Sequence, residues 1–131
     1  MIEFSYKEER LSESKTVFRP VADVIIIAGD NTEVEIPMYI DSGADLSLIP
    51  LRFGRALGFT KEGKSIEEMR GIASTLPYIR QNVKFKFNNE IIDAEIAWAL
   101  IEEVPALLGR KDIFDAFKIT FLQQQKKIIF E

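Results

Sequence analysis

The sequence of 131 residues contains no cysteine and no histidine. Without cysteine the chain can form neither a disulfide nor a thiolate-bound zinc site, and it has no thiol nucleophile. Without histidine, Ser-His-Asp triads, histidine-bound metals and the commonest general base at neutral pH are also excluded. Any acid–base chemistry must therefore be carried out by Asp, Glu, Lys or Tyr side chains.

The chain also lacks a long apolar run and an excess of basic residues. Apolar runs such as residues 24–28 are much too short to cross a bilayer. A net charge of -4 does not favour binding to nucleic acid or to an anionic membrane surface. Residues 1–4 show no beginning of a signal peptide. Together with the absence of cysteine, these features predict a cytoplasmic protein without nucleic-acid or membrane partners.

Hydrophobic residues make up 47% of the chain and charged residues 29%, which is the balance of a globular protein with one core. We therefore expect a single domain over residues 1–131. Its N-terminal part begins with a short strand over residues 2–6. The charged residues 7–10 and the following residues 11–14 are expected to form an exposed loop or flexible arm, so that residues 1–15 are a possible N-terminal arm.

Alternating apolar and polar residues predict short strands along most of the chain. Three hairpins are expected, joining residues 16–27 to 33–40, residues 78–87 to 91–100, and residues 118–121 to 127–130. A short strand at 47–49, a hairpin-like excursion with its tip at 71–74, and short helices over 51–57 and 110–116 complete the pattern. Because no long helix is predicted, the expected fold class is all-β, a folded-over sheet or closed barrel.

One turn stands out because it places a carboxylate at the end of an apolar strand. Residues 38–40 lead directly into Asp41-Ser42-Gly43-Ala44-Asp45. Asp, Ser and Gly are common turn residues for local reasons, so an ordinary turn is the default interpretation of these letters alone. The alternative is that the turn presents Asp41 to solvent for chemistry, and a second motif downstream favours that interpretation.

That second motif is Ala106-Leu107-Leu108-Gly109-Arg110. In this order and spacing the two motifs resemble those of the retropepsin-like aspartic proteases, the family of the single-lobed retroviral proteases. The resemblance spans roughly residues 20–130 and includes three segments: the Asp-Thr/Ser-Gly-Ala turn at 41–45, a glycine-bearing flap at Gly71, Ile72 and Ala73, and the hydrophobic-hydrophobic-Gly motif at Leu107, Leu108 and Gly109, followed by a helix. The expected fold is then the single lobe of an acid protease.

The resemblance implies an aspartic endopeptidase, in which two neighbouring carboxylates share one proton and activate a water molecule. The chain contains a single Asp-Ser/Thr-Gly sequence. The second carboxylate would therefore be Asp41 of another copy, in a homodimer with twofold symmetry. The implied substrate is an extended peptide or unfolded protein, and neither a metal nor another cofactor is expected.

The resemblance also implies roles for the residues around Asp41. Ser42 would form a hydrogen bond across the dimer axis, and Gly43 would allow the backbone to approach the substrate closely. Asp45 would present its backbone to the substrate and pair with Arg110. The remaining motif residues would support the active loop (Ala44, Leu107, Leu108 and Gly109) or close over the peptide (Gly71, Ile72 and Ala73).

Two other functions stay open at this point. A dimeric, non-catalytic module of the same fold could bind extended peptides, although binding alone gives no physical need for the Asp41 carboxylate. A glycosidase with two carboxylates is less consistent with the sequence, because no acidic pair with neighbouring sugar-stacking aromatic residues is evident. Oxygen-only binding of Ca²⁺ or Mg²⁺ by the acidic pairs at 67–68 and 102–103 also stays open.

Overall fold

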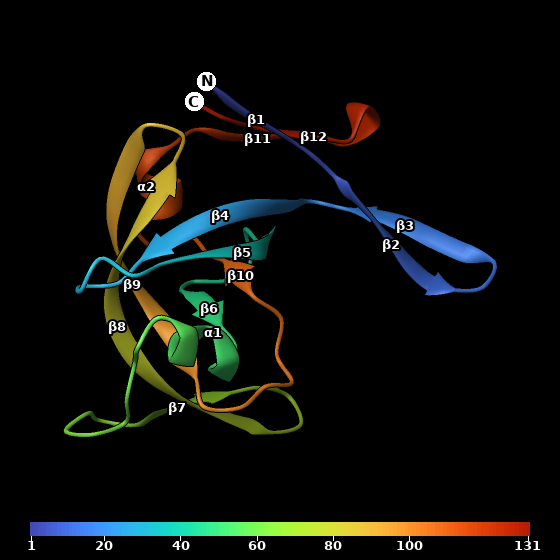
Figure 1. Ribbon diagram of the computed structural model, residues 1–131. Coiled ribbons are helices and arrows are strands. Elements are labelled where there is room, and N and C mark those ends of the chain that lie inside the picture. Colours follow the sequence, from blue (N-terminus) through green and yellow to red (C-terminus); the bar gives the residue numbers. More distant parts are fainter.

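Six strands close into a small barrel (Figure 1), seen in a computed structural model that describes all of residues 1–131. Neighbouring strands are hydrogen-bonded in the order β4–β5–β10–β6–β9–β8, and pairing of β8 with β4 closes the circle. The strands are β4 (Val21–Ile27), β5 (Glu33–Ile40), β10 (Leu107–Leu108), β6 (Ser47–Ile49), β9 (Glu90–Ala99) and β8 (Thr75–Phe87). The all-β fold class predicted from the alternation of residue types is confirmed.

The barrel is filled by the inward-facing residues of each strand. In β4, Val24 and Ile26 are buried while Asp23 between Ala22 and Val24 is exposed, because successive side chains of a strand point to opposite faces. Trp98 of β9 is also buried, and its indole N–H donates to the carbonyl oxygen of Leu51 at 3.1 Å. The single tryptophan is thus a core residue with its polar group satisfied.

A second, three-stranded sheet joins the two ends of the chain. It has the order β1 (Ile2–Ser5), β12 (Lys127–Phe130), β11 (Ile119–Leu122), with a short 3-10 turn η1 (Gln123–Gln125) between the last two strands. The N- and C-termini consequently lie side by side at the top of Figure 1. Phe130 is fully buried, and its ring centroid lies 5.3 Å from that of Phe4 and 5.5 Å from that of Phe87. The apolar C-terminal strand is therefore covered within the chain.

The residues expected to be an exposed loop form a β-hairpin instead. Strand β2 (Lys7–Ser12) pairs with β3 (Lys15–Arg19), and the hairpin projects away from the barrel (Figure 1). The prediction of a loop over residues 7–14 was wrong because both faces of this hairpin are largely exposed to water. A strand that buries neither face needs no alternation of apolar and polar residues, so its sequence resembles a charged loop.

The two helices are short. Helix α1 (Leu51–Ala56) occupies the predicted position, whereas α2 (Ile113–Ala116) is shorter than the predicted range of 110–116. The reason lies at Asp112, whose φ of 70° is incompatible with a right-handed helix. Neither helix has the length and apolar character needed to cross a membrane. The remaining strand, β7 (Glu67–Arg70), pairs with β8 through the predicted turn at 71–74.

Candidate active site

Asp41 follows β5 directly, where the strand ends in a tight turn. Its backbone N–H donates to the carbonyl oxygen of Leu108 at 3.0 Å, and its own carbonyl accepts from the N–H of Ala44 at 3.2 Å. The Asp41 side chain is partly exposed, and its Oδ1 accepts a hydrogen bond from the Gly43 N–H at 2.9 Å. Asp41 forms no ion pair with any Lys or Arg in the chain. The turn therefore presents a carboxylate that is oriented but has no cationic partner.

The motif at 106–110 packs against this turn because β10 is inserted between the strands on either side of it. Leu107 pairs in parallel with Tyr39 of β5 and antiparallel with Leu48 of β6. Gly109, which follows β10, lies so close to the turn that begins at Asp41 that a Cβ there would be 2.7 Å from the carbonyl carbon of Leu46. A side chain cannot be placed at that distance from backbone, so the contact requires glycine.

Ser47 connects the two motifs from inside the protein. Its hydroxyl oxygen accepts a hydrogen bond from the Gly109 N–H at 2.9 Å, and the residue is only 1% exposed. Ser47 is the single polar residue among the buried residues of the protein. The sequence analysis did not identify this role, since Ser47 stands in the pattern only as part of a short strand. The available signal was the position of Ser47 between Leu46 and Leu48, which suggests a buried hydroxyl with a hydrogen-bond partner.

Arg110 holds the turn at residues 42–45 in place through three contacts. Its Nη1 donates to the carbonyl oxygen of Ser42 at 3.0 Å, and its Nη2 contacts the Asp45 carboxylate. Its backbone N–H also donates to the carbonyl oxygen of Ala44 at 2.8 Å. The predicted Asp45–Arg110 ion pair is present in the structure. Both side chains are well exposed, so the pair adds less than about 1 kcal/mol by itself and matters chiefly for the position of the loop.

A cavity of about 460 Å³ lies beside Asp41. Its apolar lining comes from Pro20, Ile40, Pro105 and Leu107, and its polar lining from Glu9, Arg19, Tyr39 and Asp41. The Tyr39 hydroxyl donates to Glu9 Oε2 at 2.8 Å. This hydrogen bond, together with partial burial, raises the pKa of Tyr39 above its ordinary value. The sequence analysis missed Glu9, Arg19 and Tyr39, because nothing in the pattern indicated that the N-terminal hairpin reaches the active turn.

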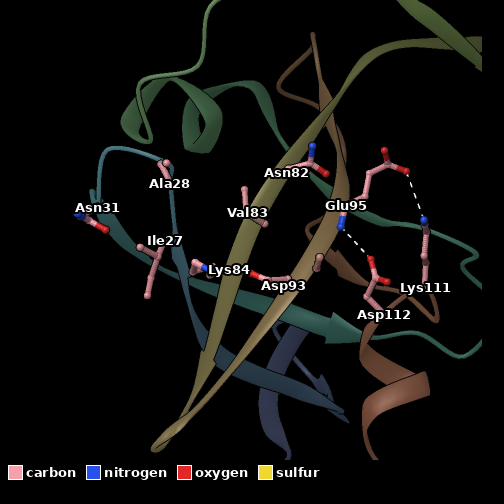
Figure 2. Close-up of a pocket in the computed structure, with 12 residues that line it drawn as sticks. Ile27, Ala28, Asn31, Asn82, Val83, Lys84, Asp93, Glu95, Lys111 and Asp112 are labelled. Atoms are coloured by element: carbon pink, nitrogen blue, oxygen red, sulfur yellow. Dashed lines mark hydrogen bonds and ion pairs between the residues drawn. The ribbon is translucent and has the colours of Figure 1, made fainter.

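A slightly larger hollow of about 500 Å³ lies elsewhere, between β4, β8, β9 and the start of α2 (Figure 2). Its charged side chains are matched with one another: Lys84 pairs with Asp93, and Lys111 with Glu95. The Asp112 carboxylate accepts a hydrogen bond from the Glu95 N–H at 2.8 Å, as Figure 2 shows. A hydrogen bond from Arg80 lowers the pKa of Glu95 against the opposing effect of burial. None of the predicted site residues lines this hollow. Its ion pairs connect neighbouring strands and the residues just before helix α2, so they stabilise the fold.

The predicted flap residues form the tip of the hairpin between β7 and β8, at the end of the molecule opposite the terminal sheet (Figure 1). The Gly71 N–H donates to the Ser74 carbonyl oxygen at 2.8 Å, which closes the turn. The Ile72 side chain is fully exposed. Gly71, Ile72 and Ala73 do not line the cavity at Asp41 in this single chain. Their role over a substrate therefore stays a prediction.

No protein-family model and no curated protein sequence matches the chain. Solved structures do. The EIAV protease complexed with the inhibitor HBY-793 is similar with a TM-score of 0.58 and 20% sequence identity, over 82% of this chain and 93% of that one. A retropepsin-like aspartic protease from Rickettsia conorii is similar with a TM-score of 0.57 and 16% identity, over 97% of this chain and 95% of that one. The chain therefore has the fold of the retropepsin-like aspartic proteases.

Proposed function

We propose that the protein is an aspartic endopeptidase that is active as a homodimer. The observation that carries the proposal is the Asp41 carboxylate, which is oriented by the Gly43 N–H, left without a cationic partner, and located beside a cavity. An acid meant only to stabilise the turn would gain more from a nearby cation, as Asp45 does from Arg110. Asp41 is instead available to approach a second carboxylate.

The chemistry requires that second carboxylate. Two like charges held close together cannot both ionise cheaply, so a pair of aspartates retains one proton between them. The ionised member removes a proton from a water molecule that attacks the peptide carbonyl carbon, while the protonated member donates its proton to the carbonyl oxygen. The tetrahedral intermediate then collapses: the C–N bond breaks, the amine nitrogen takes the proton removed from water, and the second carboxylate recovers its proton from the hydroxyl that becomes the carboxyl group. Because the chain has a single Asp-Ser-Gly sequence, a twofold axis passing between two Asp41 residues is the economical way to build the pair.

An extended peptide or unfolded protein is the substrate class that fits this arrangement. In such a peptide the backbone groups are free to pair with exposed protein backbone, in the manner of an added strand. In the dimer, the tips at Gly71–Ala73 would close over the peptide and exclude water from the reaction. Ser42, next to Asp41 and exposed, is positioned in sequence to meet its counterpart across the axis.

The decisive experiment compares wild type with Asp41→Asn on a synthetic peptide library, with cleavage read by mass spectrometry. Asp93→Asn is the matched control, because Asp93 is highly exposed and pairs only with Lys84. We expect Asp41→Asn to abolish cleavage and Asp93→Asn to retain it. Equal cleavage by wild type and Asp41→Asn would refute the proposal. Peptide binding without cleavage by both proteins would instead identify a non-catalytic binding module.

Mixing wild type with Asp41→Asn tests the shared site directly. If the two chains are refolded together in equal amounts, about a quarter of random dimers contain two Asp41 residues. Activity should therefore fall to about a quarter of that of wild type at the same total concentration. A fall to only half would mean that each copy works alone.

A further inference from the structure

The N-terminal hairpin forms part of the wall of the cavity at Asp41. Two of its residues, Glu9 of β2 and Arg19 of β3, line the same cavity as Asp41. A substrate side chain next to the bond being cleaved would enter this cavity, so it would meet groups that the hairpin supplies. The inference below rests on the proposed function, and it concerns which side chains the cavity accepts.

Glu9 is held in place from two sides. Its Oε2 accepts the hydrogen bond from the Tyr39 hydroxyl at 2.8 Å and lies 3.6 Å from Nε of Arg19. Both contacts use Oε2, so the other oxygen of this partly exposed carboxylate stays available as an acceptor. A carboxylate that is already oriented loses little conformational entropy when it binds a cation. Glu9 therefore offers one fixed and unused acceptor at the cavity wall.

The charges around the cavity favour a cation. Arg19 is balanced by its neighbour Glu9, and the shared Asp41 pair keeps one negative charge after it retains a proton. The sum is one negative charge, so an acidic side chain would be repelled and a basic one attracted. The apolar residues Pro20, Ile40, Pro105 and Leu107 provide a surface for the methylene groups of a long side chain.

We propose that Glu9 is a specificity-determining residue, which makes the cavity select Lys or Arg over Asp or Glu next to the cleaved bond. In a twofold dimer the same cavity occurs on both sides of the active site. The selection therefore applies to the residue before the cleaved bond and to the residue after it. Tyr39 is the positioning residue that orients Glu9.

The test uses a synthetic peptide library of random sequence, digested separately by wild type, Glu9→Gln and Glu8→Gln. Glu9→Gln keeps the size of the side chain and its acceptor for the Tyr39 hydroxyl but removes the charge. Glu8 is the matched control, because its side chain lies on the opposite face of β2 from that of Glu9 and does not line the cavity. Cleavage sites that disappear with Asp41→Asn are counted by the residue on each side of the bond.

We expect wild type and Glu8→Gln to show the same excess of basic over acidic residues at these positions. In Glu9→Gln the excess should fall about 1.5- to fivefold, the size of one partly exposed charge interaction. An unchanged ratio in Glu9→Gln would overturn the inference while leaving the protease intact. Complete loss of cleavage by Glu9→Gln, with the fold retained, would also overturn it, because Glu9 would then belong to the acid–base machinery. A wild type without Asp41-dependent cleavage would refute the proposed function itself, and the inference with it.

Discussion

Replacement of Ser47 by alanine tests whether its buried hydrogen bond with Gly109 stabilises the contact between the turn at Asp41 and the motif at 106–110. The variant removes the acceptor of the Gly109 N–H, and both Gly109 and Ser47 are buried. The loss includes the net value of the hydrogen bond, about 0.5–1.5 kcal/mol, and the cost of a buried donor without a partner, which brings the total to about 1–3 kcal/mol. For a domain of this size, each kcal/mol lowers the midpoint of thermal unfolding by about 3–6 °C.

Urea unfolding measures this effect, at one fixed protein concentration because the stability of the proposed dimer would depend on concentration. We expect Ser47→Ala to shift the midpoint to lower urea with an unchanged slope. Ser65→Ala, in an exposed loop, should change the free energy of unfolding by less than about 0.5 kcal/mol. If Ser47→Ala is as stable as Ser65→Ala, the hydrogen bond to Gly109 does not contribute and the account of the coupled motifs is wrong.

Two further predictions concern backbone packing and acid stability. Gly109→Ala should destabilise the protein by about 1–3 kcal/mol or more, because its Cβ would collide with the Leu46 backbone. Gly29→Ala is the control and should not destabilise the protein, since no atom lies within 4 Å of its Cβ. Equal urea midpoints for the two variants would contradict this packing. Glu95 has a lowered pKa because of the hydrogen bond from Arg80, so its contribution is present above its ordinary value of 4.5 and is lost as the pH falls through the lowered value. Glu95→Gln should therefore lose less stability than wild type in urea unfolding between about pH 7 and pH 3, and parallel losses would show that Glu95 does not titrate differently on folding.

The strands of the barrel could be predicted from the sequence because each buries one face. In β4 and β5 the alternation of residue types records which side chains face the core. The hairpin β2–β3 shows no such alternation because both its faces are exposed to water, so its sequence was interpreted as a loop. Helix α2 was predicted too long because the positive φ of Asp112 could not be foreseen from the residue type, since aspartate also occurs in the first turn of helices.

The candidate site could be predicted only in part. Asp41 and the motif at 106–110 were recognisable together, and the structure does bring them into contact through Leu108 and Arg110. The polar part of the cavity wall was not recognisable, because Glu9 and Tyr39 are 30 residues apart in the sequence and meet only once the hairpin is folded. Contacts of this kind depend on tertiary geometry, and local residue patterns do not encode them.

The pairing of β1 with β12 has a consequence for how the chain acquires its structure. Ile2 faces Phe130 across this sheet, so β1 finds its neighbour only after residues 127–130 have been synthesised. Pairings between residues so distant in sequence form late and slowly, because a large loop must be closed first. During synthesis on the ribosome, Phe4 would remain uncovered until Phe130 arrives. A chain interrupted before β12 would thus leave the apolar residues of β1 and β11 without their partner strand, which makes such fragments prone to aggregation and degradation.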